Sequence, residues 1–72
     1  MLPLSFTNAG EEVMVVKIGG NSDVKQHLMD LGFVPGAVIQ IISQHKGDVI
    51  VNLKDSHLAI TEQMAKKIMV QN

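Results

Sequence analysis

The chain has 72 residues, a formal net charge of −1, no cysteine and no arginine. This length allows one small domain, and the missing cysteines exclude disulfides, thiolate metal sites and cysteine nucleophiles. A chain with neither a basic excess nor more than two aromatic residues lacks the cationic face and stacking side chains that favour nucleic-acid binding. No apolar run approaches the roughly 20 residues of a membrane helix, and the N-terminus has no signal-peptide pattern. We therefore expect a cytoplasmic protein with a single domain over residues 1–72.

Residues 11–18, EEVMVVKI, predict the first strand, because β-branched residues follow a turn signal and precede two glycines. Strict alternation would place side chains on two faces: Met14, Val16 and Ile18 on one, and Val13, Val15 and Lys17 on the other. The valines of the second face would then meet a second covered surface.

The hydrophobic period changes after Gly20, where Val24, Leu28 and Leu31 recur at the spacing of one helix face. This pattern predicts a helix from Ser22 to Leu31. Ser22 is the expected N-cap, and Asp23 lies in the first turn, where the helix dipole favours an acidic side chain.

The motif LGFVPG, residues 31–36, predicts a joint between this helix and the next strand. Gly32 is expected to take the left-handed conformation that ends a helix, with Phe33 folded back onto Leu28. Pro35 and Gly36 suit the two central positions of a type II turn, since proline fixes φ at the first and glycine supplies a positive φ at the second. We therefore assign Gly32, Pro35 and Gly36 a structural role.

The remaining sequence predicts further short strands at residues 37–44, 48–54, 57–61 and 68–70. His45–Asp48 is the expected tip of a hairpin and Asp55–Ser56 a tight turn, while Thr61 is expected to cap one helical turn. About five short strands with one inserted helix indicate a mainly β fold, a small SH3-like barrel that hides its strand edges. An OB-like barrel is the less suitable alternative, because about 70 residues is short for that fold.

Asp23, His27 and Asp30 are the candidate metal ligands, since they follow one another along the predicted helix. Asp23 and Asp30 would lie roughly 10 Å apart on a convex face, too far for all three residues to bind one ion. We interpret them as a solvated polar face and expect neither a metal site nor a cofactor. A small barrel filled by its own side chains also offers no deep pocket, so we do not expect an enzyme.

Apolar side chains that fall outside the predicted core indicate where a partner could bind. Ile42 and Ile50 lie on strands with apolar residues on both faces, and Met29 flanks the apolar stripe of the helix. Methionine adapts to irregular surfaces, which makes Met29 the most suspect of the five methionines.

With these elements in place, the chain resembles the ferrous iron transport protein A (FeoA) family over nearly its whole length. The resemblance rests on residues spread along the chain: Gly10-Glu11, Leu28, Leu31-Gly32-Phe33, Pro35-Gly36, Val49, Val51, Leu58-Ala59-Ile60, Ala65, Ile68 and Val70. It implies an SH3-like accessory protein without enzymatic activity. Such a protein docks on the cytoplasmic part of the membrane ferrous iron transporter FeoB and modulates uptake. The family often has arginines ahead of the helix leucines, where this chain has Val24-Lys25-Gln26-His27.

Two other functions remain open: a regulatory domain related to the C-terminal domain of iron-dependent repressors, and a weak divalent-metal-binding module. A nucleic-acid-binding barrel is disfavoured, because the chain has no arginine and no basic stripe. We predict partner contacts at Met29, Phe33 and Val34, and we expect that exposed β-branched faces permit a homo-oligomer.

Overall fold

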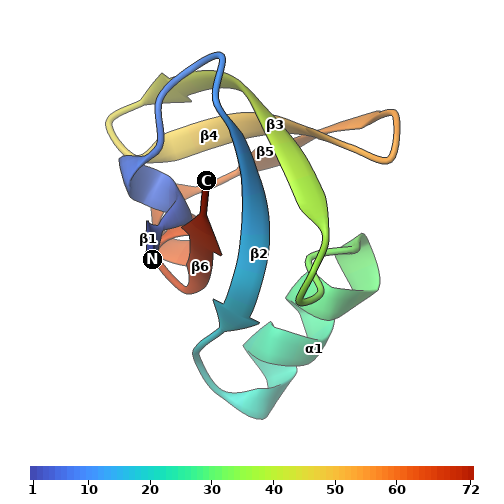
Figure 1. The fold of residues 1–72 in the computed structure, drawn as a ribbon. Coiled ribbons are helices and arrows are strands. Elements are labelled where there is room, and N and C mark those ends of the chain that lie inside the picture. Colours follow the sequence, from blue (N-terminus) through green and yellow to red (C-terminus); the bar gives the residue numbers. More distant parts are fainter.

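The computed structural model of the protein describes residues 1–72 (Figure 1). In chain order, its elements are β1 (Leu2–Pro3), the 3-10 helix η1 (Leu4–Phe6), β2 (Glu12–Ile18), α1 (Ser22–Leu31), β3 (Val38–His45), β4 (Asp48–Leu53), β5 (Ser56–Ile60), α2 (Glu62–Ala65) and β6 (Ile68–Gln71). The predicted helix is confirmed at both ends, and the final strand is longer by one residue. The short segments β1 and η1 carry no periodic pattern and were not predicted.

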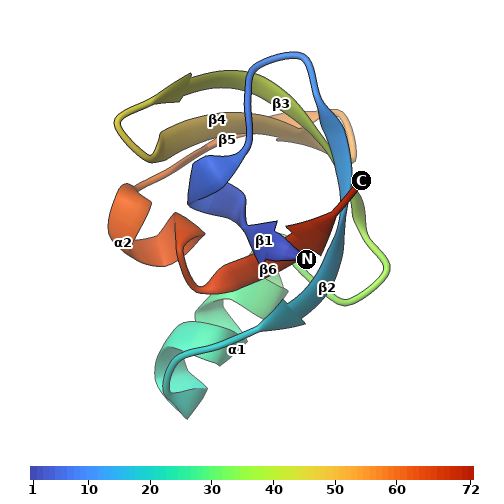
Figure 2. The ribbon, with the colours of Figure 1, turned by 60° about the vertical axis from the view of Figure 1, so that its left-hand side comes forward.

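The six strands form one antiparallel sheet in the order β1-β6-β2-β3-β4-β5. The sheet curls around a single core, with α1 inserted between β2 and β3 at one end (Figure 2). The 3-10 helix η1 contacts β4, β6 and α2, so these two short helices cover the open side of the curled sheet. The mainly β, SH3-like architecture expected from the sequence is confirmed.

The core is one cluster of fifteen buried apolar residues: Leu4, Val13, Val15, Ile18, Leu28, Phe33, Ile39, Ile41, Val49, Val51, Leu53, Ile60, Ala65, Ile68 and Val70. Every element except β1 contributes to it. The alternation predicted for β4 is confirmed, since the side chains of Val49, Val51 and Leu53 all point inward. Leu4 of η1 is completely buried and fills the barrel from its open side.

The predicted faces of β2 are confirmed up to Val16 and wrong for Lys17 and Ile18, and a β-bulge is the reason. The pairing of β2 with β6 shifts register between Val15 and Lys17. One extra residue at this point changes which side chains share a face. Ile18 therefore joins Val13 and Val15 in the core, and these valines face the main core rather than a second covered surface.

Both predicted helix caps need correction. Asn21, not Ser22, caps α1, because its Oδ1 accepts a hydrogen bond of 2.9 Å from the backbone N–H of Val24. Thr61 occupies the cap position of α2, but its side chain makes no capping bond. Instead, Oδ1 of Asp48 accepts a 2.7 Å bond from the N–H of Glu62, so the cap comes from a distant strand.

Candidate docking surface

The joint between α1 and β3 has the predicted backbone. Gly32 has a φ of 112°, and its N–H donates to the carbonyl of Met29 at 3.0 Å. The N–H of Phe33 donates to the carbonyl of Leu28, also at 3.0 Å. These two bonds form a Schellman motif, in which the first two residues beyond the helix bond back to its last turn.

The turn after this motif is also confirmed. The N–H of Ala37 donates to the carbonyl of Val34 at 2.9 Å, and Gly36 has a φ of 93°. Pro35 stands at the preceding central position, as a type II turn favours. The N–H of Gly36 donates to the carbonyl of Val15 at 2.8 Å, which ties the turn to β2.

Phe33 is wrong as a contact candidate, because the structure buries it completely. Its ring is the largest of the fully buried side chains. The hydrophobic contact of the Schellman motif explains this position, since it folds the residue after Gly32 back over the last helical turn. Phe33 therefore stabilises the fold and offers nothing to a partner.

The other two contact candidates keep part of their surface. Met29 and Val34 are half-buried, and Met29 packs against the core. Between them in sequence, Leu31 is 39% exposed and was not predicted as a contact. We call Met29, Leu31 and Val34 the joint surface. Its side chains lie on the last turn of α1 and the loop that follows, both held by the bonds described above.

The three candidate metal ligands on α1 are all exposed. Oδ1 of Asp30 accepts a 2.8 Å hydrogen bond from Nε2 of Gln26, a neighbour one helical turn away. Nowhere in the structure do three or more histidine, cysteine or acidic side chains gather closely enough to hold a metal ion. Asp23, His27 and Asp30 thus lie along the polar side of the helix, with Leu28 buried on the other side.

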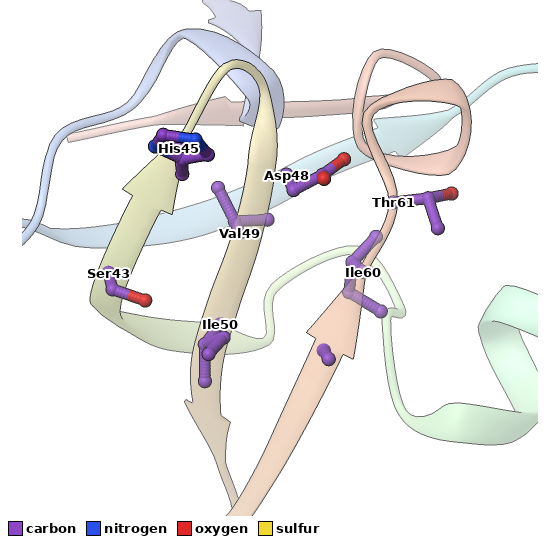
Figure 3. Close-up of a pocket in the computed structure, with 8 residues that line it drawn as sticks. Ser43, His45, Asp48, Val49, Ile50, Ile60 and Thr61 are labelled. Atoms are coloured by element: carbon purple, nitrogen blue, oxygen red, sulfur yellow. The ribbon is translucent and has the colours of Figure 1, made fainter.

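A hollow of about 280 Å³ lies on the outer face of β3, β4 and β5 (Figure 3). Eight residues line it: Ser43, His45, Asp48, Val49, Ile50, Ala59, Ile60 and Thr61. The strand pairing explains why Ile50 lies at the centre of the hollow. Ile50 of β4 is paired with Ser43 of β3 on one side and with Ala59 of β5 on the other. These short neighbours leave Ile50 standing in an open space.

The hollow combines exposed apolar side chains with polar residues at its rim. Ile50 is 41% exposed, and Ile42, just before Ser43 on β3, is 43% exposed, which confirms that both isoleucines lie outside the core. Of the polar residues at the rim, Asp48 already uses its Oδ1 to cap α2. In the sequence, the only sign of this hollow is Ile50, an isoleucine on the otherwise polar face of β4. Its small neighbours Ser43 and Ala59 are brought beside it by strand pairing, which the sequence pattern does not reveal.

Fold and surface together define a class of protein: a small SH3-like barrel with exposed apolar side chains. No helix in it has the length and apolarity required to cross a membrane. Within this class the chain belongs to the FeoA domain family, whose model matches residues 2–72.

Known members of the family agree with this assignment. The putative Fe(2+) transport protein A of Methanocaldococcus jannaschii is 39% identical over 72 residues, which is all of this chain and 88% of that protein. The crystal structure of an iron uptake regulatory protein (FeoA) superposes with a TM-score of 0.90 at 34% identity, covering 97% of this chain and 95% of the other. The FeoA protein of Chlorobium tepidum gives 0.81 at 27% identity, with 97% and 69% covered. The chain is therefore a member of the FeoA domain family, and a relative at 39% identity is named as a putative Fe(2+) transport protein.

More distant structures share the fold alone. FeoA of Stenotrophomonas maltophilia, solved in complex with zinc and described as an SH3 domain protein, is 21% identical with a TM-score of 0.83, covering 99% of this chain and 91% of that protein. ScaR with bound Zn²⁺ is 15% identical with a TM-score of 0.87 and is covered over 37% of its length. The same barrel therefore occurs both as a nearly complete chain and as part of a larger protein.

Proposed function

We propose that this protein is a cytoplasmic, non-enzymatic accessory of ferrous iron uptake that docks on the FeoB-type transporter and modulates it. The observation that carries the proposal is the match to the FeoA domain over residues 2–72, together with 39% identity to a putative Fe(2+) transport protein A. The contact is one between proteins, and the transporter contributes its cytoplasmic region with the GTP-binding domain.

The docking site that we propose is the joint surface. Leu31 is 39% exposed at the end of α1, and the half-buried Met29 and Val34 stand two residues before it and three residues after it in the sequence. The backbone below these side chains is held by the Schellman motif and the type II turn, so little conformational entropy is lost when a partner binds. Exposed aliphatic side chains on a rigid support are a suitable core for a protein interface.

The test is a binding titration between the purified cytoplasmic region of the transporter and this protein. Leu31→Lys should weaken binding by about tenfold or more, because it places a charge at the centre of an apolar contact. Ile42→Lys is the matched control, since Ile42 is exposed to nearly the same extent, 43%, on a different element. This control should bind as the unmodified protein does.

Two results would contradict the proposal. One is no binding to the transporter together with retention on duplex nucleic acid at physiological salt. The other is an equal loss of binding in both lysine variants, which would remove the joint surface as the docking site.

A further inference from the structure

The lower row of the hollow in Figure 3 is an apolar floor with short side chains beside it. It consists of Ser43, Ile50 and Ala59, which are consecutive partners across β3, β4 and β5. The side chain of Ile50 is 41% exposed, and its two neighbours are too short to cover it. An exposed apolar surface of this kind is covered favourably by the aliphatic part of a ligand.

The upper row of the hollow is polar and carries a single full charge. His45 is paired with Asp48, and Thr61 follows directly after β5 on the other side of Asp48 (Figure 3). The side chains of all three residues, like that of Ser43, can accept a hydrogen bond. No lysine is among the eight residues that line the hollow. The hollow therefore offers a ligand one negative charge and several acceptors.

The carboxylate of Asp48 is already held in place by one of its oxygens. Its Oδ1 accepts the 2.7 Å bond from the N–H of Glu62 that caps α2. Its Oδ2 makes no hydrogen bond within the protein. A cation that binds at Oδ2 thus meets an oriented carboxylate, and little side-chain entropy is lost in the contact.

We propose that this hollow binds a lysine side chain of a partner protein. The ammonium group donates to Oδ2 of Asp48, and the aliphatic stem lies over Ile50. These two residues are neighbours on the outer face of β4, two positions apart, which places them roughly 7 Å from each other at about 3.4 Å per residue. The four-carbon stem of an extended lysine spans a similar length.

The carboxylate geometry favours lysine over arginine. The guanidinium fork of arginine binds best to both oxygens of a carboxylate at once, but Oδ1 of Asp48 already bonds to Glu62. An ammonium group is a compact charge with three donors, so Oδ2, the neighbouring Thr61 hydroxyl and water can satisfy it. An anionic ligand would instead be repelled by Asp48.

The open position of the hollow favours a side chain of a protein over a free amine. Asp48 and Ile50 are both exposed, and an exposed ion pair contributes little because water screens it. A free amine is therefore expected to bind only at millimolar concentrations. A lysine that belongs to a partner protein gains from the other contacts of the same interface, because each further contact is then intramolecular.

The experiment is an NMR titration of the isotope-labelled full chain with N-acetyl-lysine methylamide, which carries the complete side chain. The amide signals of Ile50, Ala59 and Thr61 should shift and saturate at millimolar concentrations. Methylammonium carries the charge alone, and N-acetyl-norleucine methylamide carries the stem alone. Each should bind about fivefold more weakly than the lysine probe, because the site uses both parts.

Three variants test the two parts of the site. Asp48→Asn removes the charge but keeps an oxygen that can cap α2, and it should weaken binding of the lysine probe by about fivefold. Asp55→Asn is the matched control, because Asp55 is an exposed aspartate in the other hairpin and does not line the hollow. It should leave binding unchanged. Ala59→Leu fills the space beside Ile50 from an exposed position and should abolish the saturable shifts.

Equal binding of the lysine and norleucine probes would overturn the proposal. The same holds for equal losses in Asp48→Asn and Asp55→Asn, which would show a diffuse effect of net charge, and for shifts that do not saturate by about 100 mM. The proposal is independent of transporter docking, which we place on the joint surface. The titration involves no transporter, so either proposal can fail alone.

Discussion

The two hairpins of the sheet use the same loop in different surroundings. Both loops have two residues, both begin with lysine, and both have a positive φ at each position: 53° and 91° at Lys46-Gly47, 51° and 63° at Lys54-Asp55. These angles define type I′ turns, which match the twist of paired strands. The first loop has glycine at its second position, whereas the second loop has aspartate.

Packing explains this difference. Gly47 is buried, and a Cβ at this position would overlap the side chain of Glu62. The next residue, Asp48, caps α2 through the N–H of Glu62. The loop between β4 and β5 is exposed at both residues and is free to carry a side chain. A positive φ alone is thus tolerated by Asp55, but a positive φ under a packed helix requires glycine.

The largest expected effect comes from Gly47→Ala. Backbone strain and overlap with Glu62 together should destabilise the fold by about 3 kcal/mol. Urea denaturation measures this loss. The double variant Gly47→Ala/Glu62→Ala removes the overlap and should recover about half of the loss. An alanine at Gly47 that leaves the unfolding midpoint unchanged would show that packing does not distinguish the two loops.

The same contrast between packing and strain can be tested in the joint after α1. Gly32 and Gly36 both have a positive φ, but a Cβ on Gly32 would lie 2.9 Å from Cδ2 of Leu53, whereas a Cβ on Gly36 would have no neighbour within 4 Å. Gly32→Ala should therefore cost about 2 kcal/mol and Gly36→Ala about 1 kcal/mol. Thermal unfolding of the two variants under one condition gives the comparison, and equal losses would contradict it.

A smaller effect is expected from Asp48→Ala, which removes the cap of α2 but leaves the loop itself unchanged. The loss should be about 1 kcal/mol, the usual contribution of a capping side chain. Asp48→Asn is the control, because its side-chain oxygen can still accept the bond from Glu62, and it should retain most of the stability. If the asparagine and alanine variants unfold at the same denaturant concentration, the cap is not what ties the first hairpin to α2.

The smallest expected effect is a gain. Asp55→Gly should stabilise the protein by about 0.5 kcal/mol, because glycine adopts a positive φ without steric cost and nothing packs on this loop. Differential scanning calorimetry can resolve the resulting rise in the unfolding temperature. The reciprocal change, Gly47→Asp, should destabilise, and a gain there would mean that the two loops are equivalent.

Much of the fold was predictable because local rules apply to it. The helix from Ser22 to Leu31, the reversal at Gly32 and the turn at Pro35-Gly36 follow from hydrophobic spacing and from backbone preferences of glycine and proline. The hairpin tip at Lys46-Gly47 is predictable for the same reason. The second loop was predicted one residue late, because Lys54-Asp55 lacks the glycine that normally marks such a turn.

The candidate site was predictable only in part. Met29 and Val34, which are predicted contacts, keep part of their surface exposed, whereas Phe33 turns inward with the helix cap, and the exposed Leu31 was not predicted. At the end of a helix, neighbouring apolar residues can point to the core or to the surface, depending on how the chain turns. The hydrophobic pattern of the sequence does not tell these two cases apart.

The sequence by itself determined the family, the mainly β barrel and the backbone of the joint, because each depends on residue types at short or regular spacing. Tertiary structure decided which face of β2 reaches the core, since the bulge after Val15 arises only from pairing with β6. It also decided that Asp48 rather than Thr61 caps α2, and that Ile50 stands in a hollow between Ser43 and Ala59. These features join residues that are distant along the chain, so only the folded sheet brings them together.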